Sequence, residues 1–192
     1  MGKFYAVLNG KKAGIFTSWE ETKPLVDGFA GAVYKSFKTR EEAEAYMRGE
    51  SEETVAGLCA YVDGSFDPET GRYAYGVVIL EDGKEKEKLS GTGDDSEAAS
   101  MRNVAGELKG AMIAMRYALK NGYDKITVYH DYAGISEWAL KKWKTNLEST
   151  RAYAGFFDKI SKELKVEFIK VAAHTGVKYN EMADKLAKEA LK

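Results

Sequence analysis

One long amphipathic stretch constrains the fold of this chain most strongly. Residues 103–122, NVAGELKGAMIAMRYALKNG, carry apolar side chains at helical spacing, and Gly122 follows as a helix stop. The apolar stripe consists of residues about one turn apart: Val104, Leu108, Ala111, Met115 and Leu119. A helix with one apolar face has to bury that face against another element. The stripe therefore predicts a helix packed on a sheet.

Strand-like segments lie on both sides of this helix. The predicted strands cover residues 58–63, 72–80, 84–91, 125–131 and 165–174. The other predicted helices cover residues 133–143, 150–164 and 180–192. The turn sequences DPETG and EDGK make the first three strands an antiparallel meander, whereas the later strands require crossovers. The predicted fold class is therefore α/β (mixed α+β), with a five-stranded mixed sheet and helices on both faces.

A separate pattern precedes these strands. Residues 1–48 read as strand, strand, helix, strand and helix, with an Asn-Gly turn between the first two strands. Ser18 and Thr39 are predicted helix caps, and Glu21 completes a capping box with Ser18. These features predict a small three-stranded α+β domain. Residues 49–55 are short and acidic and predict a linker, so residues 56–192 form the second domain.

Composition limits the partners and the compartment. The 29 Lys+Arg and 30 Asp+Glu residues give a formal charge of −1, so a nucleic acid would have to be met by local basic patches. The single cysteine, Cys59, lies in an apolar strand, which excludes a disulfide framework and favours a reducing compartment. The first residues, MGKFYAVLNGKK, hold no apolar core of the length expected for a signal peptide, and no apolar run approaches ~20 residues. We expect a cytoplasmic protein without a membrane partner.

Four acids occupy analogous places in the second domain. Asp63 and Asp131 are expected at strand ends, and Glu107 and Asp184 on the first turns of helices. Taken singly, such acids are commonly turn formers or partners of the helix dipole. Together they could converge at one sheet edge, where only a bound cation makes such a group of like charges stable. Oxygen ligands select Mg²⁺ or Mn²⁺, and four acids could hold two ions for displacement at phosphorus.

The two histidines differ in their expected roles. His174 lies in a Gly-containing loop shortly before Asp184, where a group titrating near neutrality suits proton transfer to a leaving group. An alternative is a loop histidine without a task. His130 alternates with Asp131 along its strand and should face the opposite side, so it is interpreted as structural.

Four segments together resemble the motifs of type 1 ribonuclease H: YVDGSF, NVAGELKGAM, ITVYHDYAGI and HTGVKYNEMAD. The resemblance covers residues 55–192. The stretches FYAV, TSWEE, GFAGAVYKSF and TREEAEAY resemble the hybrid-binding, viroplasmin-like domain found before many such enzymes. The resemblance implies an endoribonuclease that hydrolyses the RNA strand of RNA–DNA hybrids and leaves a 5′-phosphate and a 3′-hydroxyl. Two Mg²⁺ ions per active site are implied, with Mn²⁺ as a substitute.

The resemblance also implies roles for individual residues. Asp63, Glu107, Asp131 and Asp184 would hold the metals, and His174 would assist product departure. The implied nucleic-acid contacts are Tyr5, Trp19, Tyr34, Lys35, Gly64, Ser65, Asn103, Trp143, Lys144 and Asn180. Rings against sugars and a lysine on phosphate suit such contacts, although Tyr5 and Trp19 could instead be core residues.

The expected partner is an RNA–DNA hybrid duplex, with double-stranded RNA as a second candidate ligand of the N-terminal domain and a monomer as the expected state. Three alternatives stay open. The first is a non-catalytic binder of hybrids or double-stranded RNA. The second is a DNA-cutting nuclease of the same fold, and the third is a structural oligomerisation protein. Metal-dependent cleavage separates the first, the acid spacing argues against the second, and an inert Asp63→Asn substitution would indicate the third.

Overall fold

The computed structural model describes residues 3–29, 31–47, 57–171 and 178–192. The chain divides into two compact units, one formed by the N-terminal elements and one by the later elements. The predicted linker, residues 49–55, lies outside the described residues. Among the helices that the structure describes, none is both long and apolar enough to cross a membrane.

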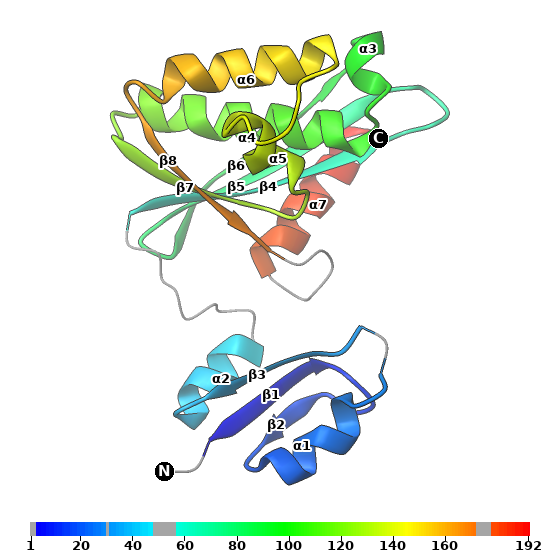
Figure 1. Ribbon diagram of the computed structural model, residues 1–192, viewed down its shortest axis with the longest axis vertical. Helices are drawn as coiled ribbons and strands as arrows, with labels where there is room; N and C mark the ends of the chain where they lie inside the picture. Colours follow the sequence, from blue (N-terminus) through cyan, green and yellow to red (C-terminus); the bar gives the residue numbers. More distant parts are fainter. Residues whose placement is uncertain (1–2, 30, 48–56, 172–177) are drawn as a thin grey trace. The chain divides into compact units, whose positions relative to one another are not determined.

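The first unit is a three-stranded antiparallel sheet with two helices (Figure 1). Its elements are β1 (Phe4–Asn9), β2 (Gly14–Phe16), α1 (Trp19–Val26), β3 (Val33–Phe37) and α2 (Arg40–Met47). Strand β1 lies in the centre and pairs antiparallel with both neighbours. The predicted hairpin around Asn9-Gly10 forms, with Tyr5 opposite Phe16. The predicted small α+β architecture is thus confirmed.

Both helices of the first unit begin at the predicted caps. The Ser18 hydroxyl accepts a hydrogen bond from the backbone N–H of Glu21 at 3.2 Å. The Thr39 hydroxyl accepts from the N–H of Glu42 at 3.2 Å, and the Glu42 carboxylate accepts from the N–H of Thr39 at 3.0 Å. These reciprocal bonds satisfy N–H groups that have no partner within the helix. The second helix therefore has a complete capping box, which the sequence indicated only through Thr39.

The second unit is a five-stranded mixed sheet in the order β6-β5-β4-β7-β8. Its strands are β4 (Leu58–Phe66), β5 (Tyr73–Glu81), β6 (Lys84–Gly93), β7 (Lys125–His130) and β8 (Lys165–Lys170). Its helices are α3 (Ser96–Ala99), α4 (Asn103–Lys120), α5 (Gly134–Ala139), α6 (Glu148–Ile160) and α7 (Lys178–Ala190). The first three strands form the predicted meander, and β7 and β8 run parallel to β4. The short helix α3 was not predicted.

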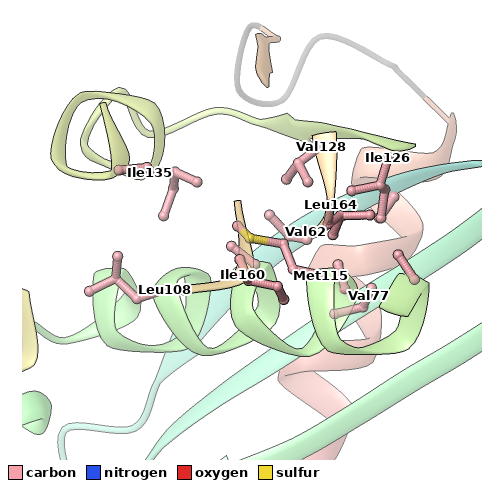
Figure 2. Packing of buried hydrophobic residues seen from close by; sticks show 14 of the residues in the cluster. Val62, Val77, Leu108, Met115, Ile126, Val128, Ile135, Ile160 and Leu164 are labelled. Carbon is pink, nitrogen blue, oxygen red and sulfur yellow. The ribbon is translucent and has the colours of Figure 1, made fainter. Parts of the chain in front are cut away.

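Helices cover both faces of this sheet, as predicted. Figure 1 shows α4 and α6 on one face and α7 on the other. The predicted stripe of α4 packs on the sheet: Leu108 and Met115 join Val62, Val77 and Val128 in one core, which Figure 2 shows. Burial of these side chains removes apolar surface from water, which is the main favourable contribution to folding. The core therefore fixes α4 on strands β4, β5 and β7.

Strand β4 continues past the position where we expected it to stop. Gly64-Ser65 was predicted to break the strand after Asp63, but β4 runs to Phe66 and pairs with β5 along its whole length. The prediction was wrong because this glycine serves a close approach instead of a turn. A Cβ on Gly64 would lie 2.0 Å from the carbonyl oxygen of Asn103, so the backbone of α4 lies directly against the strand. Asp63 is therefore an interior residue of β4.

Candidate active site

Three carboxylates from remote parts of the chain meet in the second unit. Asp63 of β4, Glu107 of α4 and Asp131 after β7 each offer one oxygen, and these oxygens lie within 4.8 Å of one another. We call these three residues the acid cluster. Such a group of oxygen ligands has the size and the chemistry of a site for a hard cation.

The strand pairing explains why Asp63 and Asp131 meet. The parallel ladder between β4 and β7 ends at the pair Tyr61–Tyr129. Asp63 and Asp131 each lie two residues beyond that last pair, one on each strand. Both acids therefore lie just beyond the point at which β4 and β7 stop pairing.

Glu107 reaches the same place because α4 lies against β4. It is the fifth residue of α4 and thus sits in the second turn, not in the first turn as predicted. The helix dipole acts mainly within the first turn and does not account for this buried acid. The packing of Gly106 on the backbone of Ala74 and Gly64 holds the helix at this depth.

Two members of the acid cluster are buried and the third, Asp131, is partly exposed, and the carboxyls of the two buried members have strongly shifted pKa values. The side chains of Asp63 and Glu107 are only 6% and 1% exposed. Burial, followed by the charge of Asp131, raises the pKa of Asp63 to about 7. Burial and the charges of Asp131 and Asp63 raise the pKa of Glu107 to about 9. Perturbed groups of this kind are typical of functional sites.

Hydrogen bonding leaves part of the acid cluster unsatisfied. Oε2 of Glu107 is buried without a hydrogen-bond partner, and the Asn103 amide donates to Oε1 over a long distance of 3.5 Å. The Gly64 N–H donates to Oδ1 of Asp63 at 2.7 Å. An unpartnered buried carboxylate oxygen is unfavourable unless something positive satisfies it. The residues present therefore fit a divalent cation.

The fourth predicted acid is placed differently. Asp184 lies in the second turn of α7, not in the first turn as predicted, and it does not belong to the acid cluster. Its Oδ2 accepts from Nζ of Lys188, one turn later on the same helix, at 2.7 Å. Asp184 is nevertheless near enough to contribute to the raised pKa of Asp63.

The first unit carries a row of three aromatic rings. Trp19 of α1 lies 5.6 Å from the ring of Tyr5 and 5.6 Å from the ring of Tyr34, measured between centroids. We call these residues the aromatic row. Trp19 and Tyr34 are exposed, so the row is not a buried core. An exposed row of rings is suited to contacts with sugars or bases.

Lys35 does not join the aromatic row. It alternates with Tyr34 along β3, and its Nζ lies 5.5 Å from the ring of Phe37 and 6.0 Å from the ring of Tyr46. Phe37 and Tyr46 belong to the core on the side of α2. Neighbouring strand residues point to opposite faces, so Lys35 lies on the other side of β3 from Tyr34, and its contact with a duplex stays a prediction.

Comparison with known families covers both units. A model described as the ribonuclease H1 N-terminal domain matches residues 3–47, and the RNase H model matches residues 56–192. The chain belongs to the RNase H family. It is a ribonuclease H enzyme, and the predicted resemblance is confirmed.

Individual relatives agree with this assignment. Ribonuclease H1 of Homo sapiens is 23% identical over 258 residues, which cover all of this chain and 90% of that protein. Ribonuclease H of Chromobacterium violaceum is 30% identical over 143 residues, which cover 68% of this chain and 92% of that protein. The crystal structure of RNase H1 from Halobacterium salinarum has a TM-score of 0.60 at 25% identity and covers 71% of this chain and 98% of that one.

The remaining predicted contact residues of the enzyme lie in different environments. Asn103 is exposed at the start of α4, beside the acid cluster. Gly64 is buried and its N–H already donates to Asp63, whereas Ser65 is partly exposed. Asn180 of α7 is buried, and its Oδ1 has no hydrogen-bond partner. Of these residues, Asn103 and Ser65 are accessible to a substrate.

Of the two histidines, His130 lies within the described residues. His174 lies outside the described residues. His130 is fully buried, with Nδ1 2.9 Å from the carbonyl oxygen of Tyr132 and Nε2 without a partner. Burial lowers the pKa of His130. The contact between His130 and Tyr132 thus links the residues before and after Asp131. This agrees with the predicted structural role of His130.

A series of contacting aromatic rings leads from the residue after Asp131 to Trp143. Lys144 directly follows Trp143 in the sequence. Tyr132 directly follows Asp131, and its ring contacts those of Trp138 and Trp143 at centroid distances of 5.8 and 6.2 Å. Trp143 is exposed and lines a surface hollow of about 580 Å³ with Lys144 and other residues. Arg151 also lines this hollow. Sequence reasoning missed Arg151, because its helix gave no sign that it faces the loop carrying Trp143.

Proposed function

We propose that the enzyme is an endoribonuclease that hydrolyses the RNA strand of RNA–DNA hybrids with two divalent cations. Water adds to phosphorus, the P–O3′ bond breaks, and the released O3′ takes up a proton, which leaves a 5′-phosphate and a 3′-hydroxyl. The observation that carries this proposal is the acid cluster with its unpartnered Glu107 oxygen. Membership of the RNase H family and the relatives called ribonuclease H1 support the choice of substrate.

The proposed metal ligands are Asp63, Glu107 and Asp131 for one cation, with Asp184 for the second. All their donor atoms are oxygens, which favours Mg²⁺, with Mn²⁺ as a substitute. The cations supply Lewis-acid stabilisation of the charge that develops on the phosphate oxygens.

The carboxyl groups of the acid cluster have to lose their protons before they can act as metal ligands. Glu107 and Asp63 hold protons readily in the metal-free protein because burial raises their pKa values. A cation at the acid cluster would displace these protons and lower both pKa values. The proposed role of His174 is to deliver the proton that O3′ takes up.

Substrate recognition is proposed to involve both units. Asn103 and Ser65 lie where they could sense the 2′-hydroxyls that distinguish RNA from DNA. The aromatic row of the first unit would hold sugars of the same class of duplex, with double-stranded RNA as a second ligand. Trp143, Lys144 and Arg151 would contact the backbone of the DNA strand. A cytoplasmic monomer is proposed as the working form.

The decisive experiment compares the wild-type enzyme with Asp131→Asn on matched RNA–DNA, RNA–RNA and DNA–DNA duplexes across Mg²⁺ and Mn²⁺ concentrations. The proposal predicts cleavage of RNA in the hybrid alone, dependence on the cation, and loss of cleavage in Asp131→Asn. Mapping the product ends checks for 5′-phosphate and 3′-hydroxyl. Hybrid binding without cleavage at any cation concentration would show that the protein is a binder and would overturn the proposal.

A further inference from the structure

The ion pair on α7 lies beside the acid cluster and involves the acid proposed for the second cation. Nζ of Lys188 lies 2.7 Å from Oδ2 of Asp184, and the two side chains are 57% and 22% exposed. The other described lysine in this part of α7, Lys185, lies 3.8 Å from Glu189 and faces away from Asp184 in helical order. Only one of the two lysines thus acts on the candidate metal ligand.

The packing of α7 fixes this ion pair close to Asp63. Gly76 lies opposite Asp63 in the ladder between β4 and β5. A Cβ on Gly76 would lie 2.0 Å from the carbonyl oxygen of Ala183 and 2.8 Å from the N atom of Ala187, so α7 touches the strand backbone here. Asp184 and Lys188 directly follow these two contact residues in the sequence. The helix cannot move away from the sheet without losing this contact.

The charges on α7 reach the acid cluster. Asp184 raises the pKa of Asp63 and Lys188 lowers it, so both groups are electrostatically coupled to the acid cluster. An ammonium group in this position partly neutralises four carboxylates when no cation is bound. The same group repels a divalent cation and holds a carboxylate oxygen that this cation would need.

We propose that Lys188 is a tethered competitor for the second cation: its ammonium group occupies Asp184 and weakens binding there, while leaving the acid cluster free for the first cation. This inference rests on the proposed two-cation function. Lys188 acts through Asp184 and is a positioning residue. The consequence is a built-in difference between the two cation affinities, so that the first site fills well before the second.

The test measures cation binding by the full chain without nucleic acid. Mn²⁺ is titrated into the metal-free protein, and free Mn²⁺ is counted by electron paramagnetic resonance, with calorimetry as a second readout. Lys188→Met keeps the apolar stem but removes the charge. We expect the affinity of the weaker Mn²⁺ site to rise about three- to fivefold, the upper part of the range for an exposed ion pair. The tighter site should change less than twofold.

Lys185→Met is the matched control, because it removes one lysine charge from the same helix without touching Asp184. Lys188→Arg keeps the charge and should keep the wild-type affinity. Both controls should leave the two Mn²⁺ affinities within twofold of the wild type. Circular dichroism of each variant confirms that α7 is intact, and Lys188→Gln replaces Lys188→Met if the latter does not fold.

If the weaker site binds Mn²⁺ equally well in Lys188→Met and Lys185→Met, the inference about Lys188 is overturned. The proposed function would then still be judged by hybrid cleavage. Tightening of both sites alike would also overturn it, because a general charge effect would then explain the result. A wild-type protein that binds no Mn²⁺ at all would overturn the inference and the two-cation function together.

Discussion

Gly64 of β4 and Gly106 of α4 lie face to face, so that a Cβ on Gly106 would come within 2.9 Å of the Gly64 Cα. In the sequence, Asp63 directly precedes Gly64, and Glu107 directly follows Gly106. The contact of the two backbones therefore sets the distance between two members of the acid cluster. A side chain at either glycine would separate the helix from the strand.

Gly64→Ala should destabilise the second unit by about 3 kcal/mol, because the new methyl group meets the backbone of α4 and overpacks the contact. Hybrid cleavage should fall as well, since Glu107 moves away from Asp63. The matched control is Gly155→Ala in α6, where a Cβ meets nothing within 4 Å. There the helix should gain about 0.5–1 kcal/mol. Thermal unfolding followed by tryptophan fluorescence measures both, and equal effects would contradict the role of the contact.

Asp63→Asn should raise the thermal midpoint of the metal-free protein by a few degrees while abolishing cleavage. The substitution removes one of several like charges that are buried together, which relieves repulsion. Differential scanning fluorimetry in the presence of a chelator measures the midpoint. The exposed substitution Glu69→Gln serves as the control and should leave the midpoint unchanged. A lower midpoint in Asp63→Asn would indicate that the acid is structural.

The stability of the metal-free protein should decrease from about pH 5 to about pH 9. The pKa values of Asp63 and Glu107 are raised to about 7 and about 9, so the folded state binds protons that the unfolded chain releases above about pH 4. Because the folded state holds more protons, the free energy of unfolding falls as pH rises through the folded pKa values and levels off above them. Glu107→Gln should flatten this dependence in chemical unfolding curves, and saturating Mg²⁺ should remove it.

Trp19→Ala should weaken hybrid binding about tenfold, because the central ring of the aromatic row is lost. The measurement is fluorescence anisotropy with a labelled hybrid, in an Asp131→Asn background that prevents cleavage. Trp19→Phe retains a ring and should recover most of the affinity. The slope of affinity against salt should stay constant, since no charge is lost. A wild-type affinity for Trp19→Ala would exclude the row as a binding surface.

His130→Leu should lower stability by about 1–2 kcal/mol and also slow cleavage, because the carbonyl of Tyr132 loses its buried donor beside Asp131. His130→Asn places an N–H group near the former Nδ1 position and should recover cleavage better than His130→Gln. Cation affinity by calorimetry should follow the same order. Equal cleavage in the Asn and Gln variants would argue that the ring matters for packing alone.

Much of the fold could be predicted from periodicity and cap chemistry. The stripe of α4, the meander of β4 to β6 and the caps at Ser18 and Thr39 depend on local spacing, and the structure confirms them. Helix α3 was missed because four residues are too few to show a period. Strand β4 was cut short because a glycine in a strand looks like a breaker until the helix that contacts it is known.

The site was predictable in its residue types but less so in its geometry. The two strand acids meet because parallel strands bring their ends together, which the chain order already suggested. The pair Asp184–Lys188 could have been found from its spacing of four residues, but for Asp184 we weighed metal binding and a helix-dipole role and no ion pair. The Glu97 carboxylate accepts from the N–H groups of Glu148 and Ser149 at 2.7 and 3.0 Å, a contact across 51 and 52 residues that no local pattern reveals.

The members of the acid cluster come from a strand, a helix and a loop that are remote from one another in the sequence. No fragment holding only one of these segments can assemble the site, and a chain that loses the sheet loses all three positions together. Hybrid cleavage is consequently lost together with the native state. A denaturation curve followed through catalysis should superimpose on one followed through the optical signal of Trp138.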